Sequence, residues 1–243
     1  MIKAVIFDFG GVLAKPSWTT ATLVDIIKKD LGEQKNFLTE DFEKTLEEIM
    51  AKKMQIATYS MKEIPFEFVI KESLERYGVN VDTKMLEKIV WDISNADLHR
   101  VLPETELVLK TLKKEGYKVG VASNTSLYIP RRILERKGLA KYIDAIVLSR
   151  EVGYRKPHPK IYEEILNKLN VKASESIFVG DVLEIDIYGA KSVGMIGVLI
   201  SEKEPVYDEL NIDLSKLNIK KEIKPDFIID SIIEIPKILK QLN

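Results

Sequence analysis

Several polar side chains that could take part in catalysis stand far apart in this chain, and three of them close an apolar segment. These segments are rich in β-branched residues, which is typical of buried strands in a parallel sheet. Ligands bind beyond the carboxyl ends of such strands, so we expect the polar side chains to meet in one crevice. They are Asp8 after Lys3-Ala-Val-Ile-Phe, Ser123 at the end of Lys118-Val-Gly-Val-Ala, Asp181 after Ser176-Ile-Phe-Val-Gly, and in addition Lys156 and Asp186.

These residue types suit the transfer of a phosphoryl group. A carboxylate nucleophile repels a phosphate dianion unless a divalent cation bridges the two, and such a cation also polarises the phosphorus. Mg²⁺ prefers oxygen ligands and keeps several waters, so one or two carboxylates and a carbonyl are enough to hold it. The acidic residues therefore predict a Mg²⁺ site that faces a hydroxyl group and a lysine.

The composition is that of an ordinary globular protein. Its 243 residues, 45% hydrophobic and 31% charged, can form one core, or one core with a smaller lobe. With 37 basic and 38 acidic residues, the chain lacks the basic surface that nucleic acid or an anionic membrane requires. No apolar run approaches the roughly 18 residues that cross a bilayer, and the first residues resemble a strand rather than a signal peptide. Because cysteine is absent, disulfides and a thiolate nucleophile are excluded, and we expect a cytoplasmic protein.

The segment 15–99 differs in pattern from the rest of the chain. It is charged and helical, whereas strands alternate with helices before and after it. Such alternation predicts a parallel sheet with right-handed crossovers, so we expect a core of residues 1–14 and 100–243 and an inserted helical domain of residues 15–99. Within the insertion, Thr39 marks a helix start, and Ser60-Met-Lys-Glu63 has the spacing of a capping box. The predicted helices cover 18–31, 40–54, 61–77, 83–96, 103–116, 129–138, 159–170, 185–193 and 235–242; the later predicted strands cover 118–122, 144–148, 176–180, 196–200 and 227–230, and 202–225 are expected to form a loop.

Four short motifs carry a resemblance to a known family. In order they are Phe7-Asp-Phe-Gly-Gly-Val-Leu13, Val121-Ala-Ser-Asn124, Lys156-Pro157 and Gly180-Asp-Val-Leu-Glu-Ile-Asp186. Each motif alone is weak, because an Asp after a strand is often only a helix cap or a turn residue. Their order, with a helical insertion after the first, resembles the haloacid dehalogenase superfamily of phosphohydrolases. The resemblance spans residues 3 to about 200 and implies a Rossmann-like, doubly wound α/β core with a smaller helical cap domain.

The resemblance implies a Mg²⁺ site and a covalent mechanism. Asp8 would be both the nucleophile and a metal ligand, and the Gly10 carbonyl and Asp181 would complete the protein's share of ligands. Asp186 would ligate the metal directly or hold a metal-bound water. The implied reaction is Mg²⁺-dependent hydrolysis of a small phosphorylated metabolite through an aspartyl-phosphate intermediate, by a monomer or homodimer.

The resemblance also implies which groups bind the phosphate. Ser123 would donate a hydrogen bond to a phosphoryl oxygen, and Lys156 would neutralise charge on Asp8 and on the transferring group. The backbone N–H groups of Gly11 and Asn124 are further donors, because each precedes a helical or loop start.

Gly10 departs from the family pattern. Typical phosphatases of the family carry a second Asp at this position, which protonates the leaving oxygen and contributes about 10² to 10⁴-fold to the rate. Either the activity persists, as in branches with Gly there, or the enzyme favours good leaving groups such as acyl phosphates, aryl phosphates or anomeric sugar 1-phosphates. His99 and His158 could be nominated as replacement acids, but a structural or solvated role is the simpler expectation.

Three alternatives remain open. A metal-free 2-haloacid dehalogenase would share Asp8 and Lys156 but would not need the acidic pair Asp181 and Asp186. A phosphoaspartate receiver is much shorter and lacks a helical lobe of about 80 residues. In a catalytically impaired, phosphate-binding regulatory relative, Gly10 would mark lost catalysis, although the retained nucleophile and lysine argue against it.

Overall fold

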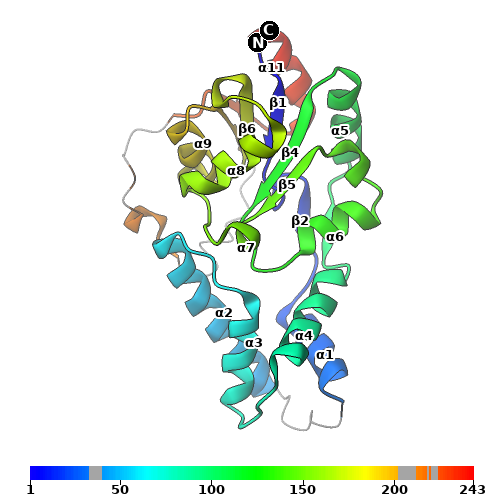
Figure 1. Cartoon of the computed structure of the whole chain (residues 1–243), viewed down its shortest axis with the longest axis vertical. Helices are drawn as coiled ribbons and strands as arrows, with labels where there is room; N and C mark the ends of the chain where they lie inside the picture. The colour runs from blue at the N-terminus through cyan, green and yellow to red at the C-terminus, as the bar shows by residue number, and fades with distance from the viewer. Residues whose placement is uncertain (33–39, 202–211, 218, 220–223) are drawn as a thin grey trace.

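The computed structural model describes residues 1–32, 40–201, 212–217, 219 and 224–243. The sheet and both chain termini lie in one lobe, and helices α1 to α4 form a second lobe at the opposite end of the molecule (Figure 1). In the described part of the chain, no helix has both the length and the hydrophobicity that crossing a membrane requires.

Six parallel strands form the central sheet of the described residues. Their order is β5-β4-β1-β6-β7-β8, so β1 pairs with β4 on one side and with β6 on the other. Because the chain builds outward in both directions from β1, the carboxyl end of β1 is a switch point, the place at which α/β sheets bind ligands. The strands are β1 (Ala4–Phe7), β4 (Lys118–Ser123), β5 (Ala145–Leu148), β6 (Ser176–Gly180), β7 (Ile196–Ile200) and β8 (Phe227–Ile229).

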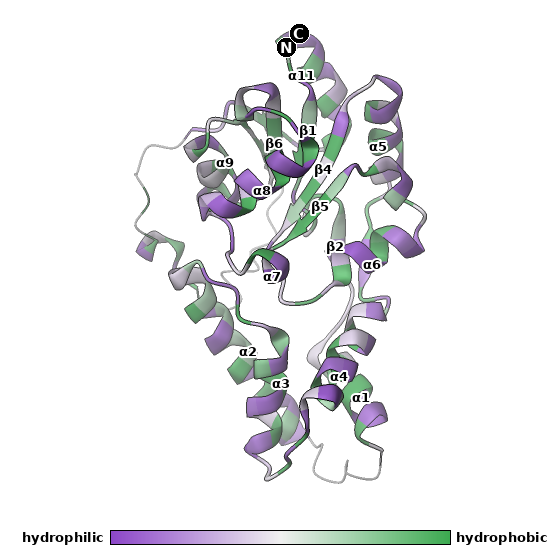
Figure 2. Cartoon of the chain, viewed as in Figure 1, coloured by the Kyte–Doolittle hydropathy of each residue, from purple (hydrophilic) through white to green (hydrophobic). Residues whose placement is uncertain are grey.

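Helices cover both faces of this sheet. In β1, Ala4 and Ile6 belong to the apolar cluster that includes α8 and α9, whereas Val5 and Phe7 belong to the cluster that includes α5 and α11. A strand buried on both faces must be apolar throughout, which explains the continuous run before Asp8. Figure 2 shows hydrophobic residues along these strands. The helices are α5 (Thr105–Lys114), α6 (Ile129–Arg136), α7 (Ser149–Val152), α8 (Pro159–Leu169), α9 (Tyr188–Ser192) and α11 (Ile235–Leu242), with short turns η2 (Ala140–Tyr142), η3 (Ala173–Glu175), η4 (Leu183–Ile187), η5 (Leu214–Lys216) and η6 (Ile232–Glu234).

The second lobe is built from the helices of the segment 15–99. Helix α1 packs on α4, and α2 packs on α3. Each helix buries an apolar stripe at helical spacing, and in α4 this stripe consists of Leu86, Ile89, Val90 and Ile93. The four helices are α1 (Thr20–Leu31), α2 (Glu40–Ser60), α3 (Phe66–Glu75) and α4 (Thr83–Asn95).

A two-stranded antiparallel ribbon lies where the chain passes between the lobes. It consists of β2 (Ala14–Pro16) and β3 (His99–Val101), so the outgoing and returning segments run side by side shortly after Asp8. The sequence analysis did not predict this ribbon, because strands of three residues are too short to show a period.

The predicted α/β fold class is confirmed, and most predicted elements are present with shifted ends. The helix expected from residue 61 begins only at Phe66, and the helix expected from 185 begins as the π-helical turn η4. Thr39 and most of the loop expected at 202–225 lie outside the described residues.

The prediction of a capping box at residues 60–63 is wrong. Ser60 is the last residue of α2, and its hydroxyl donates to the carbonyl of Ile56 at 2.7 Å. Met61 then turns the chain with a φ of 53°, and Glu63 pairs with Arg155 of the other lobe. A tertiary partner has overridden the local pattern.

Candidate active site

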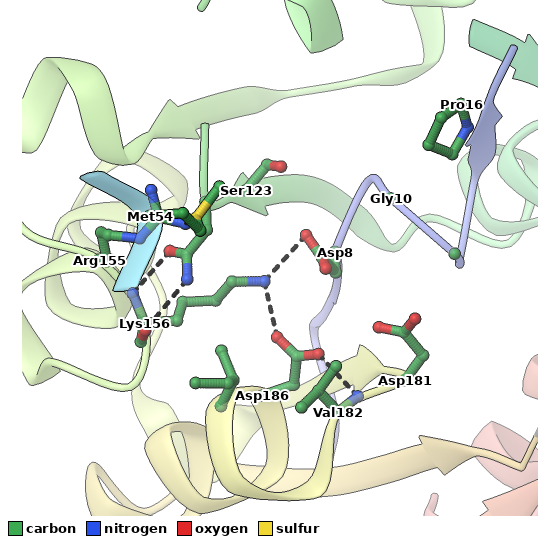
Figure 3. A pocket seen from close by; sticks show the side chains of 13 residues that line it. Asp8, Gly10, Pro16, Met54, Ser123, Arg155, Lys156, Asp181, Val182 and Asp186 are labelled. Carbon is green, nitrogen blue, oxygen red and sulfur yellow. Dashed lines mark hydrogen bonds and ion pairs between the residues drawn. The ribbon is translucent and has the colours of Figure 1, made fainter. Parts of the chain in front are cut away.

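The strand register brings the expected site residues together at the carboxyl edge of the sheet. Phe7 pairs with Val121 of β4 and with Val179 of β6, so Asp8, Ser123 and Asp181 leave three adjacent strands at nearly the same level. A cavity of about 180 Å³ opens there, and every residue expected at the site lines it (Figure 3).

Lys156 lies between two carboxylates of this cluster. Its Nζ is 2.8 Å from Oδ1 of Asp8 and 2.6 Å from Oδ1 of Asp186. The side chains of Lys156 and Asp186 are each 1% exposed, and that of Asp8 is 15% exposed. Burial opposes the charge of the lysine, but the negative charges of Asp186 and Asp8 raise the pKa of Lys156 above its ordinary value. The ammonium therefore stays charged without contact with bulk water.

Asp186 is held in place by its surroundings. Its Oδ2 accepts a hydrogen bond from the N–H of Val182 at 3.1 Å. The hydroxyl of Tyr162 donates to the carbonyl of Ile185 at 2.7 Å and so fixes the turn η4 that carries Asp186. Gly180 makes room for this carboxylate, because a Cβ at residue 180 would lie 2.3 Å from the Cβ of Asp186.

Asn124 joins the segment after β4 to the segment that carries Lys156. Its Oδ1 accepts from the backbone N–H of Lys156 at 2.7 Å, and its Nδ2 donates to the carbonyl of Lys156 at 3.0 Å. Ser123, the last residue of β4, is 5% exposed and lines the cavity beside it. The amide side chain of Asn124 thus has a structural use. The phosphate contact expected of its backbone N–H group stays a prediction.

The two glycines after Asp8 serve different needs. Gly11 has a φ of 72°, and a Cβ there would lie 2.1 Å from Oδ2 of Asp181, so only glycine fits. The N–H of Gly11 donates to the carbonyl of Ala14 at 3.0 Å, so the phosphate donor expected there is already engaged. A Cβ at Gly10 would meet nothing within 4 Å, so this position has room for a side chain.

The acidic cluster fits a divalent cation. Asp8, Asp181 and Asp186 offer carboxylate oxygens that all lie within 4.8 Å of one another. With Lys156, three carboxylates and one ammonium leave two negative charges when all are ionised. Burial, followed by the charge of Asp186, raises the pKa of Asp181 to about 8, and burial raises the pKa of Asp8 to about 6 although Lys156 opposes this. Mg²⁺ would relieve the excess charge through the oxygen ligands that it prefers.

Five residues that line the cavity were not predicted as site residues. Val182 and Ile185 lie inside the last of the four motifs, and the other three are Pro16, Met54 and Arg155. Pro16 of β2 and Met54 of α2 come from the segment 15–99 and carry no chemical signature that a sequence could reveal. Arg155 is 3% exposed and directly precedes Lys156. Its position next to Lys156 was the one feature of the sequence that could have indicated a place at the site.

The two histidines occupy positions that suit the structural or solvated roles expected for them. Burial lowers the pKa of His99 to about 4, and its ring packs on Phe9 with centroids 5.6 Å apart. His158 caps the start of α8, where its side chain accepts from the N–H of Lys160 at 3.2 Å.

The doubly wound sheet and the lysine–carboxylate cluster at its switch point define an α/β protein with an acidic pocket at the carboxyl edge of the sheet. A family model for haloacid dehalogenase-like hydrolases matches residues 2–194. The chain therefore belongs to the haloacid dehalogenase-like hydrolase family, and the prediction of a hydrolase of this family is confirmed.

Two individual relatives that align over almost the whole chain are each less than 30% identical to it. The glyceraldehyde 3-phosphate phosphatase of Pyrococcus furiosus is 28% identical over 246 residues, which cover 100% of this chain and 95% of that protein. A HAD phosphatase from Thermococcus onnurineus has a structure similar to this one with a TM-score of 0.59 at 27% identity, over 98% of each chain. A 2-haloacid dehalogenase from Pseudomonas syringae pv. Tomato DC3000 superposes with a TM-score of 0.71 at 20% identity over 100% of each chain, a likeness of fold alone.

Gly11→Ala should weaken Mg²⁺ binding, whereas Gly10→Ala should not. The new Cβ at residue 11 must displace the carboxylate of Asp181, but the one at residue 10 meets open space. We expect a loss of Mg²⁺ affinity of roughly tenfold or more for Gly11→Ala and a change within about twofold for Gly10→Ala. Isothermal titration calorimetry of both variants measures this, and equal affinities would show that Asp181 does not hold the metal.

In a chelator, the stability contributed by the acidic cluster should fall as the pH rises from about 4 to 8. The pKa values of Asp8 and Asp181 are raised from 3.8 to about 6 and about 8. The native state thus keeps protons that the unfolded state has lost, and the free energy of unfolding decreases by up to about 1.4 kcal/mol per pH unit for each group. Urea unfolding of the parent and of Asp181→Asn isolates this effect: the variant should lose less stability between pH 6 and 8. Parallel curves would contradict the raised pKa of Asp181.

Proposed function

We propose that the chain is a Mg²⁺-dependent phosphohydrolase that acts on a small phosphorylated metabolite through an aspartyl-phosphate on Asp8. The observation that carries this proposal is the buried cluster in which Asp8 and Asp186 share Lys156, with Asp181 in the same group of carboxylates. A relative aligned over the whole chain is named glyceraldehyde 3-phosphate phosphatase, which supports a phosphate ester as the substrate.

The metal would be held by Asp8, Asp181 and the carbonyl of Gly10, which all line the cavity. Asp186 would ligate the metal directly or through a water. Each of its carboxylate oxygens accepts one hydrogen bond and keeps a further lone pair for such a contact. When bound, Mg²⁺ supplies the charge that lets a carboxylate approach a phosphate dianion, and it polarises the phosphorus.

The protein's own residues account for the other steps. Oδ1 of Asp8 accepts from Lys156 and from the N–H of Phe9 at 2.7 Å, which leaves the second oxygen to attack phosphorus. The new oxygen–phosphorus bond forms as the bond to the leaving oxygen breaks, while Lys156 and the hydroxyl of Ser123 stabilise charge on the phosphoryl oxygens. Water then attacks the phosphorus, releases inorganic phosphate and restores the carboxylate of Asp8.

Gly10 offers no proton to the leaving oxygen, so in this proposal solvent or the substrate supplies it. Substrates whose leaving groups are weak bases are therefore favoured. The cavity of about 180 Å³ is smaller than the range of about 300 to 1,000 Å³ that is typical of drug-sized ligands. Its size supports a compact metabolite of a few carbon atoms.

We also infer that residues 15–99 act as a cap on a catalytic core of residues 1–14 and 100–243. Pro16 and Met54 bring this segment to the cavity, and the ribbon of β2 and β3 marks the crossing between the two parts. In this arrangement the core supplies the chemistry and the cap encloses the substrate.

A metal-free dehalogenase is disfavoured by the charge of the site. A halogenated acid carries its own carboxylate, and the acidic cluster would repel it unless a cation were present. Lys156 alone cannot neutralise the three clustered carboxylates.

Asp8→Asn should abolish turnover of p-nitrophenyl phosphate, by roughly 10³-fold or more, because an amide cannot form the acyl phosphate. Chelation of Mg²⁺ should have a similar effect in the parent. The matched control is Asp25→Asn, whose side chain is 77% exposed in α1 and should leave the rate unchanged. Hydrolysis by Asp8→Asn at the parental rate, or full activity in chelator, would refute the mechanism.

Gly10→Asp should accelerate hydrolysis of substrates with poor leaving groups. The position has room for the side chain, and a general acid contributes about 10² to 10⁴-fold where proton transfer limits the rate. We expect a gain of roughly 10²-fold for an alkyl phosphate and less than about threefold for an aryl phosphate, measured as kcat/KM. A uniform change for both substrates would show that the missing acid does not limit the reaction.

A further inference from the structure

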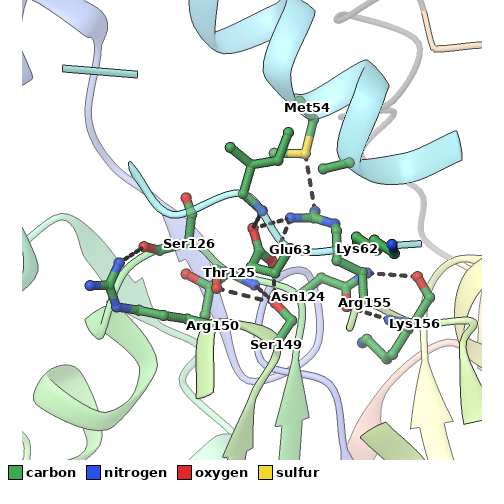
Figure 4. Close-up of polar contacts among 12 residues, drawn as sticks. Met54, Lys62, Glu63, Asn124, Thr125, Ser126, Ser149, Arg150, Arg155 and Lys156 are labelled. Carbon is green, nitrogen blue, oxygen red and sulfur yellow. Dashed lines mark hydrogen bonds and ion pairs between the residues drawn. The ribbon is translucent and has the colours of Figure 1, made fainter. Parts of the chain in front are cut away.

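Glu63, in the connection between α2 and α3, is buried against the segment that carries Lys156. Nη1 of Arg155 donates to both carboxylate oxygens of Glu63, at 3.0 Å and 2.8 Å. The two side chains are 2% and 3% exposed, so neither charge is solvated by bulk water. The hydroxyl of Ser149 also donates to Oε2 of Glu63 (Figure 4).

These contacts belong to a closed ring of hydrogen bonds and chain neighbours beside the cavity, of which Asn124, Arg155 and Lys156 line the cavity itself. In the ring, Glu63 pairs with Arg155, and the next residue, Lys156, uses its backbone N–H and carbonyl to form hydrogen bonds with the side chain of Asn124. The residue after Asn124 is Thr125, whose N–H donates to the hydroxyl of Ser149 at 2.8 Å. The hydroxyl of Ser149 donates to Glu63, which closes the ring. The segments after β4 and before α8 are joined directly by Asn124 and Lys156, and the carboxylate of Glu63 from the inserted lobe forms a second link between them.

The backbone fixes Glu63 in this place. Its N–H donates to the carbonyl of Gly153 at 3.0 Å, and the N–H of Arg155 donates to the carbonyl of Met61 at 3.0 Å. Lys62 and Tyr154 pair as an isolated antiparallel bridge between these contacts. Nη2 of Arg155 also contacts the sulfur of Met54 at 3.0 Å, so the same arginine reaches the part of α2 that lines the cavity.

We propose that Glu63 is a positioning residue for the phosphoryl transfer suggested above, an inference that rests on that proposed function. By closing the ring, Glu63 sets Lys156 and the Ser123–Asn124 segment at the spacing that a transferring phosphoryl group needs. Loss of this carboxylate leaves the two hydrogen bonds between Asn124 and Lys156 as the remaining link of the ring, so the two segments can shift relative to each other. Shifts of about 1 Å can cost about 10²-fold in rate. The donors at the phosphate are therefore fully arranged only when residues 61–63 are docked on the sheet lobe.

A second ion pair in the same region provides the matched control. Glu67 of α3 pairs with Arg150 of α7 at 2.9 Å and 2.5 Å, and Arg150 also donates to the carbonyl of Ser126. This pair joins the same two lobes, but it is more exposed, at 18% and 14%, and it lies outside the ring. Glu67→Gln therefore weakens docking of the lobe and leaves the ring closed.

The test compares Glu63→Gln with Glu67→Gln in two measurements. Steady-state kinetics with p-nitrophenyl phosphate and Mg²⁺ should show kcat reduced about 10- to 100-fold in Glu63→Gln, with KM changed less than about threefold. Hydrogen exchange should show faster exchange of the N–H groups of Thr125 and Lys156 in the same variant. In Glu67→Gln, both kcat and these exchange rates should stay within about twofold of the parent.

A double variant separates positioning from stability, because Glu63→Gln alone leaves Arg155 as a buried, unpaired cation. Replacement of both Glu63 and Arg155 by Met removes both charges and still cuts the ring. It should recover the parental melting temperature while kcat stays low and the two N–H groups exchange fast. Recovery of kcat together with stability would overturn the proposal, as would equal losses in Glu63→Gln and Glu67→Gln. If the parent fails to hydrolyse the phosphate ester, the proposed function is wrong, and the exchange rates alone decide whether Glu63 holds the two segments.

Discussion

The buried ammonium of Lys156 is the constraint on which the rest of the site depends. Moving such a group out of water costs several kcal/mol, and the cost is offset only when opposite charges lie close by. Asp8 and Asp186 supply them at 2.8 Å and 2.6 Å. This need accounts for a series of local features: the π-helical turn that presents Asp186, the hydroxyl of Tyr162 beneath it, and the absence of a Cβ at residue 180.

The same cluster is unbalanced in charge. One ammonium cannot neutralise three carboxylates. Burial raises the pKa values of Asp8 and Asp181, and the negative charge of Asp186 raises them further. A protein that needed only structural stability would gain by replacing one of these acids with a neutral residue. Retention of the excess charge at the switch point of the sheet, beside a hydroxyl and a lysine, suits a site that is completed by a divalent cation and an anionic substrate.

Much of this arrangement could be predicted from the sequence, because it depends on local and periodic features. The apolar runs that end at Asp8, Ser123 and Asp181 predicted strands, and the geometry of a parallel sheet then required their ends to meet. The ribbon of β2 and β3 was not predictable, since its strands are too short to show a period. Nor was the hydrogen bond from the N–H of Gly11 to Ala14, which depends on how the loop closes on itself.

The error at residues 60–63 shows the physical limit of such prediction. The spacing of Ser60 and Glu63 satisfies the pattern of a helix start, and in an isolated peptide a capping box would be the best use of both side chains. In the folded chain, Arg155 is buried beside that acid, and an unpaired buried cation costs far more than the roughly 1 kcal/mol that a cap contributes. Glu63 therefore pairs with Arg155, and Ser60 ends a helix instead of beginning one. A local pattern is overridden wherever a buried charge from a distant segment needs the same side chain, and that distant segment here is the one that carries the buried Lys156.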